Sequence, residues 1–308
     1  MVDIPPGLTE RVAGRAPDPA LGAEGIDGDA WLAALGRAVD GALERWGLTA
    51  DGAAMHGENA LVVPVVGPSG PAALKVTWPH EEARHEHLAL RLWAGEGAVR
   101  LLAADPAAHV LLLERLDAAR PLTAEPVLDA CEVVGDLLRR LDRPAHPRLA
   151  TVADRAERWR ADLEAGSPLV PHRLAVQGRA ELDGLLAGAP EPRTVHEDLH
   201  DANVLAPLDP ARGDWLAIDP KPVAAELAYG VAPIVWNRPE VTARATSARL
   251  HVRLRADVVA DAAGLDPERV RAWTHVRLVL NALEAARHAP ASDGFRDRMI
   301  TLAKAFAD

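Results

Sequence analysis

One stretch of the chain, HEDLHDAN at residues 196–203, has the residue types of an active site and fits two different chemistries. It begins with H-E-x-x-H, the pattern in which two histidines hold zinc and the glutamate acts as general base. Read from His196 through Asp198 to Asn203, it also has the H-x-D-x-x-x-x-N spacing of a kinase catalytic loop. Residues elsewhere in the chain must decide between zinc hydrolysis and phosphoryl transfer.

The zinc interpretation lacks the residues that would complete it. H-E-x-x-H works only on a helix, where side chains four positions apart share a face, and residues 201–203 are poor helix formers. Zinc also needs a third protein ligand, and the candidate Glu226 stands in no recognisable motif. Cys131 is the only cysteine, so a cysteine-based zinc site is excluded. Phosphoryl transfer is therefore the better interpretation.

A phosphoryl transferase needs a carboxylate at the acceptor hydroxyl, two oxygen ligands for a metal ion, and a cation on the nucleotide phosphates. Asp198 and Asn203 supply the first carboxylate and an amide oxygen at the required spacing. Asp219 ends the apolar run WLAID and is placed to supply the second metal ligand. Lys75, inside the strand-like run AALKVTW, is the candidate cation. The four residues occur in the chain order of a kinase.

Lys75 lies in a run that otherwise favours burial. A buried lysine is costly without a partner, so we expect a carboxylate to face it. The alternative is a lysine on an edge strand that points to water. On the following predicted helix Glu81, Glu82 and Glu86 are the candidate partners, with a narrow preference for Glu82. Any one of the three taken alone is more typical of solvated surface.

The run LLLERL at residues 111–116 is expected to join two lobes, and the backbone of Leu113, Glu114 and Arg115 is placed to bond an adenine edge. A protein kinase would also show a G-x-G-x-x-G loop before Lys75 and a D-F-G triplet at the metal site. Neither is present, since Asp219 is followed by a proline and a lysine. The chain therefore indicates a small-molecule kinase.

Composition limits the partners and the compartment. The chain has 308 residues, 49% of them hydrophobic, so it is long enough for two lobes with a sizeable core. A formal net charge of −11 argues against nucleic-acid binding and suits a cationic small-molecule partner. No signal peptide or apolar run of membrane-spanning length is present, which predicts a cytoplasmic protein without a membrane partner. The oligomeric state stays open.

Hydrophobic periodicity predicts an α+β fold, with a small mixed lobe at residues 1–116 that contains an antiparallel sheet, and a mostly helical lobe at 117–308. Residues 1–28 read as an irregular lead-in, and Pro64 suggests an edge strand or a bulge. Cys131 reads as a core residue. The main expected elements are helices at 29–48, 79–95, 125–142, 149–187 (broken at 166–168) and 267–288, and strands at 60–66, 71–78, 98–105 and 108–116.

The chain resembles the aminoglycoside phosphotransferases, and among them the streptomycin 6-kinase and hydroxyurea-type resistance kinases of actinobacteria. The resemblance covers nearly the whole chain in the family's order, and WLAIDPKP and LLLERLD are its more specific parts. It is carried by the segments IPPGL, LVVPV, AALKV, EGAVRLL, LLLERLD, HEDLHDANVLA, WLAIDPKP and VWNR.

The resemblance implies a protein-kinase-like two-lobe fold, ATP, Mg²⁺ and transfer of the γ-phosphoryl group to a hydroxyl of an aminoglycoside, giving antibiotic resistance. Asp198 would then be the catalytic base, Asn203 and Asp219 the metal ligands, and Lys75 the phosphate contact. His196 would brace the loop. A streptomycin-like substrate carries guanidinium groups, which agrees with the acidic composition.

Two positions depart from the family pattern. Glu197 replaces the usual glycine, and we expect its carboxylate to make ionisation of the neighbouring Asp198 harder. Gly230 stands where an aspartate commonly braces the catalytic loop. The alternatives are therefore a kinase of the same fold for another small hydroxyl compound (hydroxyurea, a sugar or another natural product), or a weakly active nucleotide-binding relative.

Overall fold

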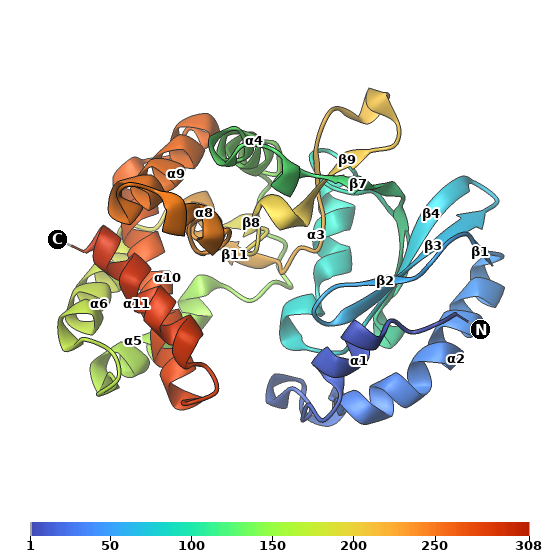
Figure 1. Cartoon of the computed structure of the whole chain (residues 1–308), viewed down its shortest axis with the longest axis horizontal. Helices are drawn as coiled ribbons and strands as arrows, with labels where there is room; N and C mark the ends of the chain where they lie inside the picture. The colour runs from blue at the N-terminus through green and yellow to red at the C-terminus, as the bar shows by residue number, and fades with distance from the viewer. Residues whose placement is uncertain (1, 308) are drawn as a thin grey trace. The chain divides into compact units, whose positions relative to one another are not determined.

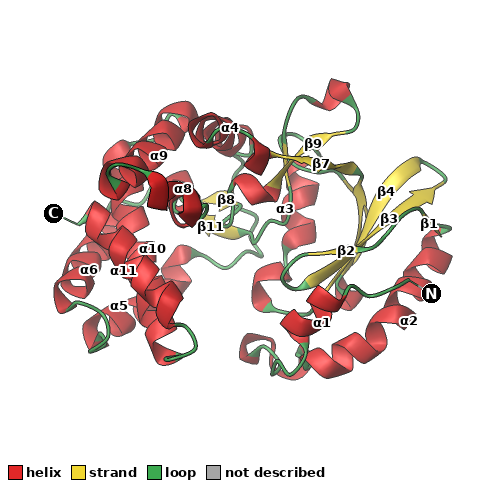
Figure 2. Ribbon diagram, in the orientation of Figure 1, coloured by secondary structure: helices red, strands yellow, loops and turns green. Residues whose placement is uncertain are grey.

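The computed structural model describes residues 2–307, and the chain divides into two compact units. Unit 1 comprises the described residues up to Ala119 together with Leu205–Lys221, and unit 2 comprises Arg120–Val204 and the chain from Pro222 onward. The segment that carries Asp219 thus belongs with the N-terminal part of the chain. Strands concentrate in unit 1, whereas unit 2 is mostly helical (Figure 2). The predicted lobe boundary after residue 116 stays a prediction.

The main sheet of unit 1 is built on the predicted hairpin. β3 (Ala60–Gly67) and β4 (Gly70–Thr77) run antiparallel with Val62 opposite Lys75. The strand order is β1-β3-β4-β6-β5, and β2 also pairs with β3. The remaining strands are β1 (Thr49–Ala50), β2 (Met55–His56), β5 (Leu101–Asp105) and β6 (Val110–Glu114).

Alternation along the strands places Lys75 on the face away from the main core of unit 1. Leu74 and Val76 belong to that core, together with residues of α1 (Pro6–Val12) and α2 (Gly28–Trp46). Because successive side chains of a strand point to opposite faces, Lys75 projects from the other face. Figure 1 shows α1 and α2 beside the labelled strands of the sheet.

Three details of unit 1 correct the sequence prediction. The lead-in is not irregular throughout, because α1 forms there and buries Leu8 and Val12, four residues apart, on one face. The helix expected at 79–95 is divided into a 3₁₀ turn at Glu81–Ala83 and α3 (Glu86–Trp93). The edge-strand expectation for β3 is also wrong, because β1 and β2 pair with it on the side away from β4.

Pro64 is accommodated on β3 in a different way. The Asp51 N–H donates to its carbonyl at 2.8 Å, between the residues that pair with β1 and those that pair with β2. The nitrogen and carbonyl of one strand residue point to the same side, so the missing N–H of Pro64 faces the gap between these two short strands.

A smaller sheet has the order β10-β9-β7, formed by β7 (Leu116–Pro121), β9 (Val204–Pro207) and β10 (Leu216–Ala217). In unit 1 the Val99 N–H bonds the Ala217 carbonyl at 2.9 Å and the Ala217 N–H bonds the Gly97 carbonyl at 2.9 Å. These bonds fix the end of β10 just before Asp219.

Unit 2 contains the two-stranded sheet of β8 (Arg193–Val195) and β11 (Val223–Ala225), surrounded by helices. α10 lies at its centre and packs on α6, α9 and α11, with Trp273 and Val276 fully or almost fully buried. Among the described residues no helix is long and apolar enough to cross a membrane. The helices of the unit are α4 (Val127–Arg140), α5 (Val152–Ala165), α6 (His172–Ala187), α7 (Pro233–Trp236), α8 (Pro239–Arg244), α9 (Ala248–Ala263), α10 (Pro267–Arg287) and α11 (Asp293–Phe306).

Candidate active site

Lys75 in unit 1 lies between two carboxylates. Its Nζ is 2.8 Å from both carboxylate oxygens of Glu86 and 2.5 Å from Oδ1 of Asp219. Lys75 and Glu86 are buried, whereas the side chain of Asp219 is 47% exposed. The alternative of an exposed edge lysine is excluded, because β4 lies between β3 and β6. The cluster holds one cation with an excess of negative charge.

The electrostatics of this cluster keep the lysine charged. Burial alone lowers the pKa of Lys75, but Asp219 and Glu86 more than offset this, so its pKa lies above the usual value. Burial raises the pKa of Glu86 to about 7, against the opposing effect of the Lys75 ammonium. Lys75 is therefore a permanent cation, held in one place by charge-assisted hydrogen bonds.

The preference for Glu82 as the partner of Lys75 is wrong. Glu82 lies in the 3₁₀ turn ahead of α3, and its Oε2 is 3.8 Å from Nζ of Lys221 in an exposed contact. Glu86 is in the first turn of α3 and its side chain is buried. The expected helix would have placed both glutamates on one face, but the break between the 3₁₀ turn and α3 separates them. Glu81 is likewise outside α3.

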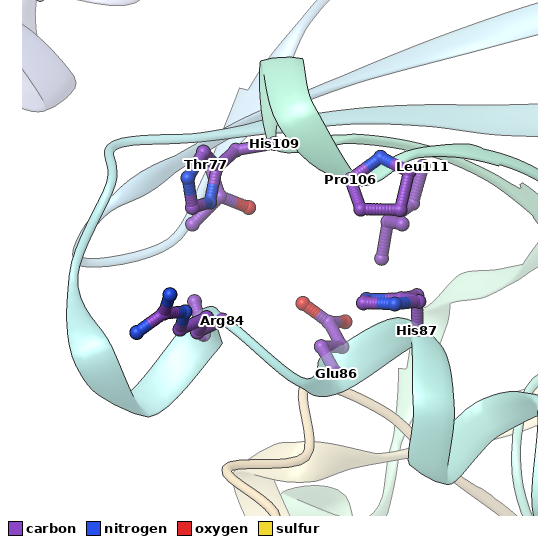
Figure 3. Close-up of a pocket in the computed structure, with 8 residues that line it drawn as sticks. Thr77, Arg84, Glu86, His87, Pro106, His109 and Leu111 are labelled. Atoms are coloured by element: carbon purple, nitrogen blue, oxygen red, sulfur yellow. The ribbon is translucent and has the colours of Figure 1, made fainter. Parts of the chain in front are cut away.

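Behind Glu86 lies a small cavity of about 10 Å³. Figure 3 shows the Glu86 carboxylate at this cavity, with His87 and Arg84 beside it and Thr77 and Leu111 opposite. A volume of this size holds roughly one water molecule. The cavity is therefore a packing gap and has no room for a substrate.

In the segment expected to bond adenine, residues 113–115, several groups already have partners within unit 1. The Glu114 N–H donates to the carbonyl of Arg100 at 2.9 Å, and the Glu114 carboxylate pairs with Arg212 at 3.0 Å. Arg115 pairs with Asp51 at 2.5 Å, and Leu113 is paired on both sides within the sheet. The Glu114 N–H therefore cannot also bond adenine. A contact through the other backbone groups of the segment stays a prediction.

In unit 2 the HEDLHDAN stretch forms a tight loop after β8. The Asp198 N–H donates to the His196 carbonyl at 2.8 Å, which closes a three-residue γ-turn around Glu197. The Asn203 side-chain N–H₂ donates to the Asp198 carbonyl at 2.9 Å. The amide group of Asn203 is thereby oriented, and its oxygen is the part left to act as a ligand.

Two basic residues hold this loop within unit 2. Asp201 is buried, with Oδ2 3.4 Å from Nε of Arg238. Arg277 donates from Nη1 and Nη2 to the Glu197 carbonyl, each at 3.2 Å. The loop is thus anchored on both sides of Asp198.

The Glu197 side chain is paired within unit 2. Its Oε1 accepts from Arg155 on α5 and from the Tyr229 hydroxyl, each at 2.5 Å. The side chain is 12% exposed. The charge of Glu197 is therefore paired with that of Arg155, and the expected effect of Glu197 on Asp198 stays a prediction.

The zinc interpretation fails on geometry. The residues from His196 to His200 form no helix, so the two histidines do not share a helical face. Glu226 is occupied by Arg269, at 2.6 and 2.7 Å, and by the Trp273 indole N–H. Within residues 2–307 no group of three or more His, Cys, Asp or Glu side chains is arranged to hold a metal ion.

The donor sets suit the groups expected for phosphoryl transfer. Asn203 and Asp219 offer amide and carboxylate oxygens, which Mg²⁺ prefers, and they belong to different units of the chain. The Lys75 ammonium suits a phosphate. Cys131 lies buried in α4, and burial raises the pKa of its thiol to about 11, so it stays protonated and unreactive.

Sequence reasoning missed the residues that hold the HEDLHDAN loop, namely Arg155, Tyr229, Arg238 and Arg277. Their signals were present but weak. Tyr229 is the only tyrosine of the chain, and Arg277 stands between the apolar residues Val276 and Leu278 of the predicted helix. Neither signal names a partner, because the contacts join segments far apart in the sequence.

The comparisons with known proteins identify the family of the chain. A sequence model of the family described as "Aminoglycoside/hydroxyurea antibiotic resistance kinase" matches residues 45–289. The streptomycin 6-kinase of Streptomyces glaucescens is 40% identical over 84% of this chain and 85% of its own length. The hydroxyurea phosphotransferase of Kitasatospora aureofaciens is 43% identical over 78% of this chain and 70% of its own length.

Among solved structures, a choline/ethanolamine kinase family protein from Mesorhizobium loti matches with a TM-score of 0.63 at 15% identity. The match covers 87% of this chain and 94% of that protein. This likeness confirms the prediction of an α+β, protein-kinase-like fold. The resemblance on which the sequence analysis relied is also confirmed: the chain is an enzyme of the aminoglycoside/hydroxyurea antibiotic resistance kinase family.

Proposed function

We propose that this chain is an ATP-dependent phosphotransferase that transfers the γ-phosphoryl group to a hydroxyl of a streptomycin-like aminoglycoside and so confers resistance. The observation that carries the proposal is the 40% identity to a streptomycin 6-kinase across most of both chains. The clustering of Lys75, Glu86 and Asp219, and the ordered loop at Asp198 and Asn203, support it.

In this proposal each candidate residue has one task. Asp198 accepts the proton of the attacking hydroxyl, and Lys75 neutralises charge on the nucleotide phosphates. Glu86 keeps the Lys75 ammonium in place, because both of its oxygens lie 2.8 Å from Nζ. Asn203 and Asp219 would hold Mg²⁺, which neutralises phosphate charge when bound.

The charge of the chain suits the substrate. A formal net charge of −11 produces a negative field that attracts a polycationic acceptor from solution. This attraction is weakened by salt, because the Debye length is about 8 Å at physiological ionic strength. We therefore expect the KM for a cationic acceptor to rise with ionic strength, and the KM for a neutral acceptor to change less.

Hydroxyurea is the second candidate acceptor. The relative named hydroxyurea phosphotransferase is 43% identical to this chain over 256 residues, similar to the streptomycin kinase. Hydroxyurea is small and neutral, so it would not use the acidic field that favours an aminoglycoside.

Coupled ADP release separates these possibilities. Purified protein with ATP and Mg²⁺ is assayed with streptomycin, other aminoglycosides, hydroxyurea and simple sugars. We expect turnover with streptomycin. Turnover with hydroxyurea or a sugar alone would reject the aminoglycoside and keep the kinase. ATP binding without ADP formation on any acceptor would indicate a weakly active nucleotide-binding relative.

A further inference from the structure

Glu197 occupies a backbone conformation that costs energy. Its φ is +62°, in the left-handed region that favours glycine, and it is the central residue of the γ-turn that ends at Asp198. A γ-turn with positive φ at its centre is rare and strained. Such strain persists only where surrounding contacts enforce it, and it concentrates at functional sites.

The contacts that enforce the turn come through the Glu197 side chain. Oε1 accepts from Arg155 and from the Tyr229 hydroxyl, each at 2.5 Å. Burial, and to a smaller extent Glu197 itself, raise the pKa of Tyr229 above its usual value, so its hydroxyl remains a donor. A glycine at 197 would adopt the same backbone at lower cost but would lose both bonds.

Arg277 holds the backbone of the same turn. It donates to the Glu197 carbonyl at 3.2 Å and to the Tyr229 carbonyl at 3.0 Å. Its guanidinium lies 4.4 Å from the centroid of the Tyr229 ring and 5.1 Å from that of Trp236, so aromatic rings fix it in place.

Position 230 has no room for a bracing side chain. A Cβ at Gly230 would lie 2.8 Å from Cγ1 of Val195 and 3.3 Å from Cδ2 of Leu138. An aspartate there would clash with β8, which leads directly into the loop. In this chain the hydrogen bonds to the loop come from Arg277, Arg155 and Tyr229 instead.

We propose that Glu197 is a positioning residue, whose carboxylate, held by Arg155 and Tyr229, keeps the strained turn that presents Asp198 to the acceptor hydroxyl. This inference rests on the proposed function only in taking Asp198 as the base. It predicts a loss of kcat without a loss of substrate binding.

Three variants test the proposal. Glu197→Gln keeps the shape and the bond from Tyr229 but removes the charge that pairs with Arg155. Glu197→Gly relieves the backbone strain and removes the side chain. Arg155→Met removes the partner. We expect each to lower kcat by about 10- to 100-fold, as small misplacements of reacting groups do, with the KM for ATP and for the acceptor nearly unchanged.

The double variant Glu197→Gln/Arg155→Met should lose little more kcat than either single variant, because both break the same interaction. Unchanged kcat in both Glu197→Gln and Glu197→Gly would overturn the proposal. So would multiplicative losses in the double variant.

A matched control exists in the same unit. Glu226 is also a buried carboxylate that accepts from one arginine, Arg269, and from one aromatic N–H, that of Trp273. Glu226→Gln should lower Tm about as much as Glu197→Gln does while leaving kcat within a factor of about 2, because the Glu226 carboxylate reaches the turn only indirectly, through the edge contact of the Trp273 ring with the Tyr229 ring. Equal kcat losses in the two variants would assign Glu197 a general structural role and overturn the proposal.

Hydrogen exchange gives a readout that does not need turnover. In Glu197→Gln the amides of residues 196–204 should exchange about tenfold faster than in the parent protein, with the rest of unit 2 unchanged. Unchanged or uniformly faster exchange would overturn the positioning role. If the parent protein phosphorylates no acceptor, the proposed function fails, and exchange still decides whether Glu197 holds the loop.

Discussion

The ion cluster around Lys75 and the one around Glu197 have opposite signs at their centres. In unit 1 a buried cation, Lys75, is held by the carboxylates of Glu86 and Asp219. In unit 2 a carboxylate, Glu197, is held by Arg155 and by the Tyr229 hydroxyl. In unit 1 the central residue is the candidate phosphate contact itself. In unit 2 it is the neighbour of the candidate base.

This difference follows from what each group must do. A lysine that meets phosphates has to keep its charge after burial, so it needs an excess of acid around it. A catalytic carboxylate has to stay accessible to the acceptor, so the loop must be held through other residues. Asp198 is 21% exposed, whereas the side chain of Glu197 is 12% exposed and that of Lys75 only 6%.

The largest effect is expected from a substitution of Asp198, the candidate base in unit 2. Asp198→Asn should lower kcat by about 10²- to 10⁴-fold, the usual contribution of a general base. The KM for ATP should hardly change, because the substitution leaves the Asn203 bond to the residue-198 carbonyl in place. Steady-state kinetics of ADP release measure both. Full activity in this variant would remove Asp198 from the mechanism.

The next largest effect is expected from a substitution of Lys75, at the centre of the unit 1 cluster. Lys75→Met should lower kcat/KM for ATP by about 10²- to 10³-fold, because it removes a fixed positive charge from the phosphates. It also leaves Glu86 buried without its cation, so Tm should fall as well. Lys304→Met is the control, because Lys304 is an exposed lysine of α11 in unit 2. Equal losses in the two variants would contradict the role of Lys75.

A smaller effect should distinguish Glu86 from Glu82, the two glutamates compared as partners of Lys75. Glu86→Gln should lower kcat/KM for ATP by about tenfold, since Lys75 keeps Asp219 but loses part of its orientation. Glu82→Gln should leave kcat/KM unchanged, because Glu82 lies in the exposed 3₁₀ turn. Kinetics with ATP as the varied substrate compare the two. A greater loss in Glu82→Gln would reverse the assignment.

The smallest expected effect on activity concerns Cys131, which lies outside both clusters. Burial raises the pKa of the Cys131 thiol to about 11, so the reactive thiolate is scarce at pH 8 and increases only as the pH approaches 11. Alkylation by iodoacetamide at pH 8 should be about 10²-fold slower in the native protein than in urea. Cys131→Ala should retain its activity. Rapid native labelling with loss of activity would add a third functional group to the comparison.

Much of unit 1 could be predicted because its patterns are local. The hairpin of β3 and β4 follows from β-branched runs around a Gly-Pro-Ser-Gly turn, and the structure places its strands within a residue or so of the prediction. The division of the helix at 79–95 was missed because Glu81–Ala83 and α3 share one polar and apolar pattern. A single missed break was enough to misplace the partner of Lys75.

The HEDLHDAN loop of unit 2 shows the opposite balance. Its candidate base and candidate metal ligand could be proposed from spacing alone, since Asp198 and Asn203 are close in sequence. Its supports could not, because Arg155, Tyr229 and Arg277 come from separate segments and meet at Glu197 only through packing. For that reason the sequence suggested that Glu197 would disturb Asp198, whereas in the folded chain the Glu197 carboxylate is paired with Arg155.

By itself, the sequence determined the residue types of the candidate site, their order, the family and the strand that carries Lys75, because each depends on short-range spacing. The tertiary structure decided which acid faces Lys75 and where the Glu197 carboxylate points. Both depend on the directions in which buried side chains point. Charged groups far apart in the sequence become partners only when folding brings them together away from water.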